Sequence, residues 1–271
     1  MASIAFPAEH APDVALPQPL PVPARAPSHP TTFVIPAYNE EENVPRLFAD
    51  LERRPWLFPE GSRVIVVDDG SSDRTVDLVR QYDGVLPVEL VALPHNQGPG
   101  AAFRAGFDAA LEGRPTESLI VTLEADTTSD LDALPQMLAE AEGGADLVLA
   151  SWKMVNVSRK RRILSKGAGF VVRRMLGLDA ETVSSFFRVY RASTLRQSFA
   201  RFGDDLMRER GFACKAELLA NLARNGARVA EVPVDLDCGR RVGKSKMPIF
   251  KTIVAYARML RRQRRAGTVT A

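Results

Sequence analysis

The chain has 271 residues, of which 45% are hydrophobic and 25% are charged, a composition typical of a globular protein with one large domain or two small ones. Its two cysteines, Cys214 and Cys238, lack C-x-x-C spacing and its three histidines are scattered. This pattern argues against a disulfide framework and a zinc site, and it makes a reducing cytoplasm the default compartment. No stretch reaches the ~20 consecutive apolar residues that span a bilayer, so we expect any membrane contact to be peripheral.

The net charge of +3 is distributed unevenly. Five arginines between residues 258 and 265 account for more than this excess, and a second basic run between 159 and 174 contains no acidic residue. Both runs indicate an anionic partner. Taken alone, they leave nucleic acid and an anionic lipid surface open.

The first 30 residues contain eight prolines and no continuous apolar segment. They do not resemble a secretory signal, which needs an uninterrupted apolar core. We expect residues 1–30 to form a disordered, proline-rich arm.

From residue 31 onward, short β-branched runs alternate with helical patterns. Such alternation predicts an α/β fold in which right-handed βαβ units build a mostly parallel sheet. The expected strands lie near 32–36, 63–67, 88–93, 118–123 and 146–150, and the expected helices near 41–54, 72–83, 99–112 and 131–142.

The pattern changes after about residue 151, where we expect the acceptor or second-substrate surface. A long basic amphipathic helix is predicted near 159–176, followed by a strand at 186–190, two helices and a strand near 228–236. The predicted domains are the arm, a catalytic domain over 31–245 with halves 31–150 and 151–245, and a basic C-terminal helix and tail over 246–271.

Three apolar runs end in acidic or hydrogen-bonding residues. The run after Thr32 leads to Asn39 and Glu40, the run after Val64 leads to Asp68 and Asp69, and the run after Leu119 leads to Glu124 and Asp126. The carboxyl ends of parallel strands meet at one edge of a sheet, so these groups should share one crevice. Carboxylates in such a crevice suit a nucleotide and a divalent cation.

These segments resemble the successive motifs of family 2 glycosyltransferases of the GT-A fold. The motifs are Pro36-Ala37-Tyr38-Asn39-Glu40-Glu41, Val66-Val67-Asp68-Asp69-Gly70-Ser71-Ser72-Asp73, Asn96-Gln97-Gly98-Pro99-Gly100 and Glu124-Ala125-Asp126. Farther on, the sequence resembles the dolichol-phosphate mannosyltransferase branch at Ser185-Phe186-Phe187-Arg188-Val189-Tyr190, Gly211-Phe212 with Glu217, Glu231-Val232-Pro233 and Arg240-Arg241-Val242-Gly243-Lys244-Ser245-Lys246.

The resemblance implies a site for a nucleoside diphosphate sugar at the strand ends. Asp126 is the expected metal ligand and catalytic residue, supported by Glu124, which stands where the family usually has Asp. Hard oxygen ligands suit Mg²⁺ or Mn²⁺ bound jointly by protein and phosphate. The expected nucleotide-sugar-binding residues are Pro36, Tyr38, Glu40, Asp68, Asp69, Asn96, Gly98, Glu124 and Asp126.

The implied acceptor is a polyprenyl phosphate, which is already an anion and needs no general base. It needs positive charge instead, and arginine binds phosphate bidentately. Arg161 and Ser165 are one helical turn apart, and the resemblance adds Arg240 and Lys246. The expected acceptor-phosphate residues are Lys153, Arg161, Ser165, Arg240 and Lys246, with Arg161 and Arg240 also regarded as catalytic.

The leading functional prediction is an inverting hexose transfer to polyprenyl phosphate, with GDP-mannose favoured as donor and UDP-glucose close behind. The expected partners are these two substrates, an anionic membrane surface and, as a further option, a membrane protein, without nucleic acid. The expected location is the cytoplasmic face of a membrane. Transfer to a hydroxyl acceptor is an alternative that requires a base such as Asp204, Asp205 or Glu217, and a noncatalytic nucleotide-sensing membrane adaptor is another.

The final helix, predicted over 247–265, is expected to lie on a membrane surface, with packing onto the sheet as the alternative. Its apolar face would carry Phe250, Ile253, Val254, Ala257 and Leu260, and its basic face Lys251, Arg258, Arg262 and Arg265.

Several notable residues also have ordinary structural explanations. Asp130 is expected to cap a helix, and Gly98 is expected to serve backbone shape. Cys214 and His95 are expected to be packing or surface residues. Lys153 and Arg188 could form surface ion pairs.

Overall fold

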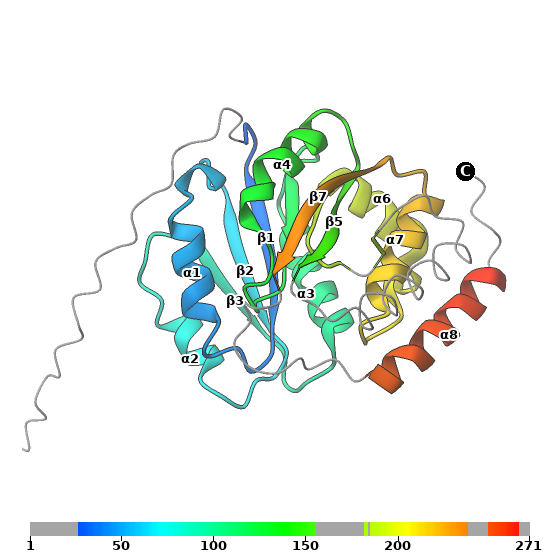
Figure 1. Cartoon of the computed structure of the whole chain (residues 1–271), viewed down its shortest axis with the longest axis horizontal. Helices are drawn as coiled ribbons and strands as arrows, with labels where there is room; N and C mark the ends of the chain where they lie inside the picture. The colour runs from blue at the N-terminus through cyan, green and yellow to red at the C-terminus, as the bar shows by residue number, and fades with distance from the viewer. Residues whose placement is uncertain (1–26, 156–181, 184, 238–248, 266–271) are drawn as a thin grey trace, which may run out of the picture.

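The computed structural model describes residues 27–155, 182–183, 185–237 and 249–265. In this part of the chain a central seven-stranded sheet has the order β3-β2-β1-β4-β6-β5-β7, with helices on both faces (Figure 1). The strands are β1 (Thr31–Ala37), β2 (Arg63–Asp68), β3 (Val88–Ala92), β4 (Leu119–Thr122), β5 (Leu147–Val155), β6 (Arg188–Arg191) and β7 (Val229–Asp237).

The sheet is mostly parallel. Strands β3, β2, β1 and β4 run in the same direction, and β5 pairs with β7 in parallel. Strand β6 is antiparallel to both of its neighbours, β4 and β5. Its first residue, Arg188, pairs with Thr122, the last residue of β4. This reversal brings the start of β6 to the edge of the sheet where β4 delivers its acidic loop.

Side chains of the strands β1, β2 and β4 alternate between two buried layers. Phe33 and Ile35 of β1 belong to one hydrophobic cluster, whereas Val34 between them belongs to the other. Both faces are covered, so the strands read as continuous apolar runs rather than as alternating apolar and polar residues. Burial of each such side chain contributes about 2 kcal/mol.

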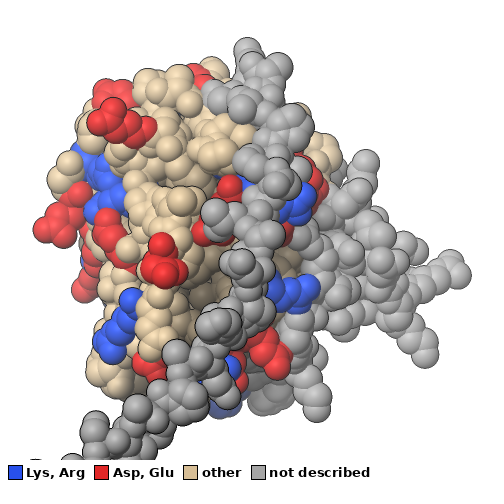
Figure 2. Space-filling view, turned by 90° about the vertical axis from the view of Figure 1, so that its left-hand side faces the viewer, with Lys and Arg blue, Asp and Glu red and all other residues tan. Residues whose placement is uncertain are grey.

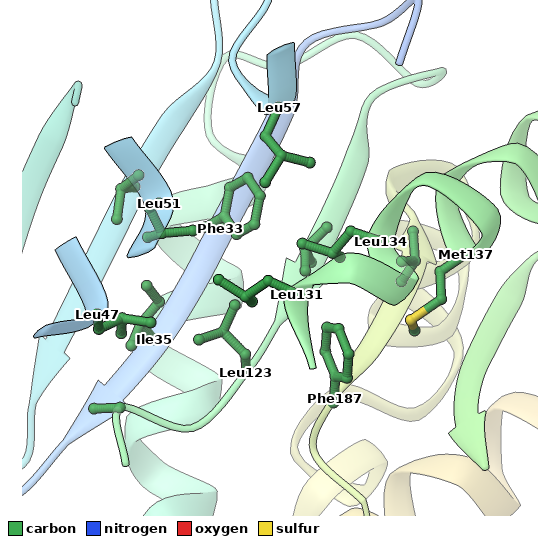
Figure 3. Close-up of a cluster of buried hydrophobic side chains, with 14 of the residues drawn as sticks. Phe33, Ile35, Leu47, Leu51, Leu57, Leu123, Leu131, Leu134, Met137 and Phe187 are labelled. Carbon is green, nitrogen blue, oxygen red and sulfur yellow. The ribbon is translucent and has the colours of Figure 1, made fainter. Parts of the chain in front are cut away.

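Helices α1 (Val44–Glu52), α2 (Thr75–Arg80) and α4 (Leu134–Glu142) cover one face of the sheet. Figure 3 shows Leu47 and Leu51 of α1 and Met137 of α4 packed around Phe33 and Phe187. The other cluster contains side chains of α3 (Pro99–Leu111), α6 (Ala192–Phe202), α7 (Cys214–Arg224) and α8 (Ile249–Arg265). Short 3-10 turns are η1 (Pro55–Leu57), η2 (Leu131–Ala133) and η3 (Gly203–Met207).

The predicted elements that fall within the described residues are present, but several are shorter than expected. The helix predicted over 41–54 begins only at Val44, and the helix predicted over 72–83 begins at Thr75. The residues before them are held in loops by side-chain hydrogen bonds described below. Residues 27–30, placed in the disordered arm, contact the body: Pro27 is buried, and the Ser28 amide donates to Glu142 (2.8 Å). The basic helix predicted over 159–176 lies outside the described residues.

Helix α8 packs against the body, so its predicted apolar face is partly wrong. Met259 and Leu260 are buried, at 0% and 6% exposure, whereas Ile253 is 61% exposed. Arg262, assigned to the outer basic face, instead donates to the buried carboxylate of Glu217 on α7 (2.8 Å). Figure 1 shows α8 beside α7 at the end of the sheet farthest from α1. No helix among the described residues is long and apolar enough to cross a membrane.

Candidate functional site

The loops after β1 and β2 are joined by side-chain to backbone hydrogen bonds. The Asn39 amide donates to Ser71 Oγ (2.8 Å), and Asn39 Oδ1 accepts from the Ser72 amide (2.8 Å). The Glu40 amide donates to Thr75 Oγ1 (2.8 Å). Asn39 has a positive φ of 54°, a conformation that Asn tolerates better than most residues. The two loops therefore form one rigid wall at the carboxyl edge of the sheet.

The predicted nucleotide-binding residues of the first loop lie on this wall. Pro36, Tyr38 and Glu40 are half-buried. Glu40 Oε2 accepts a hydrogen bond from Asn43 Nδ2 (2.6 Å), three residues later. This contact orients the Glu40 carboxylate and explains why the helix starts after it.

Asp68 is the last residue of β2. One of its carboxylate oxygens accepts hydrogen bonds, and the other accepts none from the described residues. Its Oδ2 accepts from the amides of Gly70 (3.1 Å) and Ser71 (3.0 Å). Its Oδ1 is buried and accepts no hydrogen bond from the described residues. Leaving a buried acceptor unsatisfied costs about 1–3 kcal/mol. A hydrogen-bond donor on a bound ligand would satisfy this oxygen.

Asp69 ties the second loop to the third. Both of its oxygens accept backbone N–H groups, from Gln97 (2.7 Å) and Gly98 (2.8 Å). Burial raises the pKa of Asp69, an effect that these two hydrogen bonds oppose. Gly98 has a φ of +91°, which favours glycine, so its predicted role in backbone shape is confirmed. Asn96 is exposed beside it.

Glu124 and Asp126 follow β4 at alternate positions. Asp126 is buried, and its Oδ1 accepts from the amide (3.1 Å) and hydroxyl (2.7 Å) of Thr128. Thr127 between them has a φ of +61°, which is an outlier for a β-branched residue. Such strain clusters at functional sites, where surrounding structure holds it in place. Asp130 caps η2 by accepting from the Asp132 amide (3.1 Å), as predicted.

Glu124 and Asp126 carry the kind of oxygen ligand that a divalent cation shared with a phosphate group takes. Both are hard oxygen ligands, and their positions follow one strand end. The described residues contain no group of three histidine, cysteine or acidic side chains placed to hold a metal by themselves. A cation here would therefore take further ligands from the substrate, as Mg²⁺ commonly does with phosphates.

Lys215 was not predicted as a site residue, but it lies next to Glu124. It lies on α7 with 8% of its side chain exposed, and its Nζ is 4.0 Å from Glu124 Oε1. The ammonium also lies over the rings of Phe186 (4.2 Å) and Phe212 (5.2 Å). Burial lowers the pKa of Lys215, and Glu124 opposes this shift. A lone lysine in a helical pattern gives no sequence signal for such a position.

Arg188 is also buried, so its predicted surface ion pair is wrong. It is 0% exposed, and its guanidinium donates to the backbone oxygens of Lys215 (3.0 Å) and Val183 (3.2 Å). Its Nε has no hydrogen-bond partner among the described residues. Arg188 therefore fixes the start of α7 against the start of β6.

A family model described as glycosyl transferase family 2 matches residues 32–199, which is more than half of the chain. The chain belongs to glycosyl transferase family 2. The predicted family and enzyme class are confirmed by this match. The matched residues extend from β1 into α6 and include the strand ends described above.

Two curated relatives resemble this glycosyltransferase over most of its length. An undecaprenyl-phosphate mannosyltransferase of Micrococcus luteus is 34% identical over 220 residues, covering 79% of this chain and 86% of the relative. A polyprenol monophosphomannose synthase of Mycolicibacterium smegmatis is 31% identical over 229 residues, covering 82% of each.

A solved structure shares the fold of this glycosyltransferase. Glucosyl-3-phosphoglycerate synthase from Mycobacterium tuberculosis, in complex with Mn²⁺, uridine-diphosphate-glucose and glycerol 3-phosphate, matches with a TM-score of 0.60 at 17% identity. The match covers 86% of this chain and 78% of that one. The predicted GT-A fold class is confirmed.

The predicted acceptor residues of this glycosyltransferase mostly lie outside the described part. Arg161, Ser165, Arg240 and Lys246 belong to residues that the structure does not describe. For Lys153, only the backbone is described, within β5 opposite Asp235 of β7. These five residues remain predictions.

The carboxylates considered as general bases are already engaged. Glu217 is 1% exposed and accepts from Arg262 (2.8 Å) and from the Glu209 amide (2.7 Å). Burial raises the pKa of Glu217, which these hydrogen bonds oppose. Asp204 and Asp205 are exposed and pair with arginines on the surface. Glu217 is therefore occupied in a buried ion pair, whereas Asp204 and Asp205 lie on the surface in η3, outside the three strand-end loops.

Proposed function

We propose that this glycosyltransferase transfers a hexose, with mannose favoured, from a nucleoside diphosphate sugar to a polyprenyl phosphate, with inversion at the anomeric carbon. One observation carries the proposal: similarity to two proteins named for polyprenyl-phosphate mannose transfer spans about four fifths of this chain. It therefore extends beyond the strand ends into the half expected to bind the acceptor. GDP-mannose is the favoured donor and UDP-glucose the alternative.

The three strand-end loops provide the donor site in this proposal. The joined loops after β1 and β2 would bind the nucleoside, with Tyr38 at one side and the unsatisfied Asp68 Oδ1 as a hydrogen-bond acceptor. Asp69 would act by holding the loop at Asn96 in place. Glu124 and Asp126 would hold Mg²⁺ or Mn²⁺, which neutralises negative charge on the departing diphosphate when bound.

The surroundings of the three carboxylates considered as general bases support a phosphate acceptor. Glu217 is bound by Arg262, and Asp204 and Asp205 are surface residues. A hydroxyl acceptor loses a proton as it attacks, whereas a polyprenyl phosphate is already ionised. Arg161, Ser165, Arg240, Lys246 and Lys153 are proposed to bind this phosphate.

We further propose that the enzyme acts at the cytoplasmic face of a membrane. Cys214 is a free buried thiol, as expected for a protein that folds in a reducing compartment. Exposed apolar and basic residues of α8, including Ile253 at 61% and Val254 at 42%, offer a contact for an anionic leaflet. A membrane-protein partner is a second candidate for the same residues.

A panel of labelled nucleotide sugars with a polyprenyl phosphate and Mg²⁺ or Mn²⁺ tests the proposal. Label extracted into organic solvent identifies the donor and the acceptor class together. Label transferred only to carbohydrate acceptors would replace the lipid proposal with a hydroxyl-acceptor enzyme. Metal-dependent nucleotide binding without turnover on any acceptor would indicate the nucleotide-sensing adaptor.

A further inference from the structure

Lys215 lies at the edge of the sheet where the donor site is proposed. Its backbone oxygen holds Arg188 (3.0 Å), which pairs with the last residue of β4, Thr122. Its Nζ lies 4.0 Å from Glu124, two residues after β4. The helix that carries Lys215 thus reaches the loop that contains the proposed metal ligands.

The side chain of Lys215 is 8% exposed, and its ammonium has no hydrogen-bond acceptor among the described residues. A lysine ammonium has three N–H donors, yet none of them reaches an acceptor atom among the described residues, and the Glu124 oxygen at 4.0 Å is beyond hydrogen-bond distance. Contacts with Phe186 and Phe212 compensate only part of the lost hydration. A charge that has lost most of its hydration in this way is stabilised by an anionic partner.

The local charge balance favours an anion. Arg188 is a second buried cation next to Lys215, and Glu124 is the one carboxylate within ion-pair distance of Lys215 in the part of the chain that the structure describes. Two buried cationic side chains and one nearby carboxylate leave an excess of positive charge. Phosphate oxygens are a suitable counter-charge, because lysine binds phosphate as a point charge that does not require a planar fork.

We propose that Lys215 binds a phosphate oxygen of a substrate beside Glu124 and Asp126. The inference rests on the proposed function, in which both substrates carry phosphate. The oxygen belongs either to the diphosphate of the donor or to the phosphate of the lipid acceptor. In both cases Lys215 supplies positive charge at a position where Glu124 alone would repel the substrate.

The main test replaces Lys215 by Met, which keeps the length and apolar stem but removes the charge. Arg46→Met, on the exposed surface of α1, is the matched control. Equilibrium binding is measured for GDP, GMP, UDP and UMP with Mg²⁺, and KM is measured for a short, water-soluble prenyl phosphate. We expect a loss of roughly 10- to 100-fold, the range for one charge-assisted hydrogen bond, and no loss in the control.

The two substrate sources give different results. A diphosphate contact reduces the preference for diphosphate over monophosphate nucleotide, whereas an acceptor contact raises KM for the prenyl phosphate and leaves nucleotide binding unchanged. If Lys215→Met is folded and all these values equal those of the wild type, the inference is wrong. If the wild type transfers no sugar from any donor to any prenyl phosphate, the proposed function fails instead, while Lys215-dependent nucleotide binding still supports a phosphate contact.

A second pair of variants covers the case in which Lys215→Met does not fold because Glu124 loses its partner. Glu124→Gln and the double variant Glu124→Gln/Lys215→Met differ only at Lys215, and neither leaves a carboxylate at position 124. Binding of inorganic pyrophosphate is measured in EDTA, which removes the contribution of metal. Binding of a short, water-soluble prenyl phosphate is measured in the same way. Binding of either ligand roughly 10-fold weaker in the double variant supports the inference, and equal binding of both ligands overturns it.

Discussion

Two residues with left-handed backbone conformations, Asn39 and Thr127, lie in loops at the carboxyl edge of the sheet. They are the only residues other than glycine with positive φ in the described part of the chain. Asn39 is held by hydrogen bonds to the neighbouring loop, and Thr127 lies next to Asp126. At both positions the loop changes direction through a backbone conformation that residues other than glycine rarely adopt.

Asp126→Asn should abolish sugar transfer while the fold is retained. Asn keeps an Oδ1 that can accept the Thr128 hydrogen bonds, but it loses the negative charge that binds a cation. We expect a loss of about 3 kcal/mol of transition-state stabilisation, roughly 100-fold in rate. The measurements are transfer rate and melting temperature, with the helix-capping Asp130→Asn as control. Wild-type turnover in Asp126→Asn would remove this residue from the metal site.

Cys214 should be unreactive in the folded protein. Burial raises the pKa of its thiol to about 12, so at pH 8 the thiol stays protonated and cannot act as a thiolate nucleophile. A Cys238→Ser variant, which has Cys214 as its sole thiol, should react with a disulfide reagent only after denaturation in guanidinium. Rapid reaction of the native variant would show that Cys214 is accessible.

At the scale of elements, α8 is attached to the body through buried charges. Arg262 donates to Glu209 (2.7 Å) and Glu217 (2.8 Å), which are 5% and 1% exposed. The next residue after Glu209 accepts a hydrogen bond from the amide of Gly100 (2.7 Å), at the start of α3. The contacts of α8 thus continue to the helix that follows the third loop of the proposed donor site.

Arg262→Gln should destabilise the protein much more than Arg264→Gln. Removing Arg262 leaves two buried carboxylates without their main counter-charge, because Arg258 is 3.8 Å from Glu209 and largely exposed. Breaking a buried ion pair in this way costs about 3 kcal/mol. Arg264 is exposed on the same helix and serves as the matched control. Urea unfolding measures both, and equal midpoints would show that the ionic cluster does not hold α8.

At the scale of the whole molecule, the face that carries α1 and α2 has charges of both signs. Figure 2 looks at the side of the molecule with α1 and α2, where the visible acidic and basic side chains are interspersed among uncharged ones. Such a mixed surface gives little net attraction to an anionic membrane. Among the described residues, the exposed arginines of α8 are therefore better candidates for membrane contact than this face.

Replacing Arg261 and Arg264 by Gln should weaken salt-sensitive binding to anionic vesicles by roughly 30-fold, because each arginine contributes about 1 kcal/mol near such a surface. Arg262 is left intact because it docks the helix. Arg46→Gln/Arg80→Gln, on exposed positions of α1 and α2, changes net charge equally and is the control.

The variant with Arg261 and Arg264 replaced by Gln should transfer sugar more slowly to a long-chain acceptor. Its rate with a short, water-soluble prenyl phosphate should equal that of the wild type. This difference would separate membrane attachment from chemistry. Equal vesicle binding by the wild type and both variants would assign the exposed residues of α8 to a protein partner.

Local patterns in the sequence determined the fold class and brought the acids of the candidate site to one edge of the sheet. The apolar runs that became β1, β2 and β4 are buried on both faces, and the acids that follow them lie at one sheet edge because parallel strands end on the same side. Asp130 as a cap and Gly98 as a backbone residue also followed from local chemistry. Helix starts were less accurate, because Glu40 and Asn43 bond within their loop.

Only the tertiary structure decided which distant residues meet. Lys215 reaches Glu124, although 90 residues separate them in the sequence, because β6 enters the sheet antiparallel beside β4 and Arg188 fixes α7 there. Likewise, the sequence pattern assigns Arg262 to a basic helix face, but in the folded chain its guanidinium pairs with the buried carboxylates of Glu209 and Glu217. Periodicity reports which face of an element is buried, whereas strand order and helix docking determine what that face contacts, so these pairings required the folded chain.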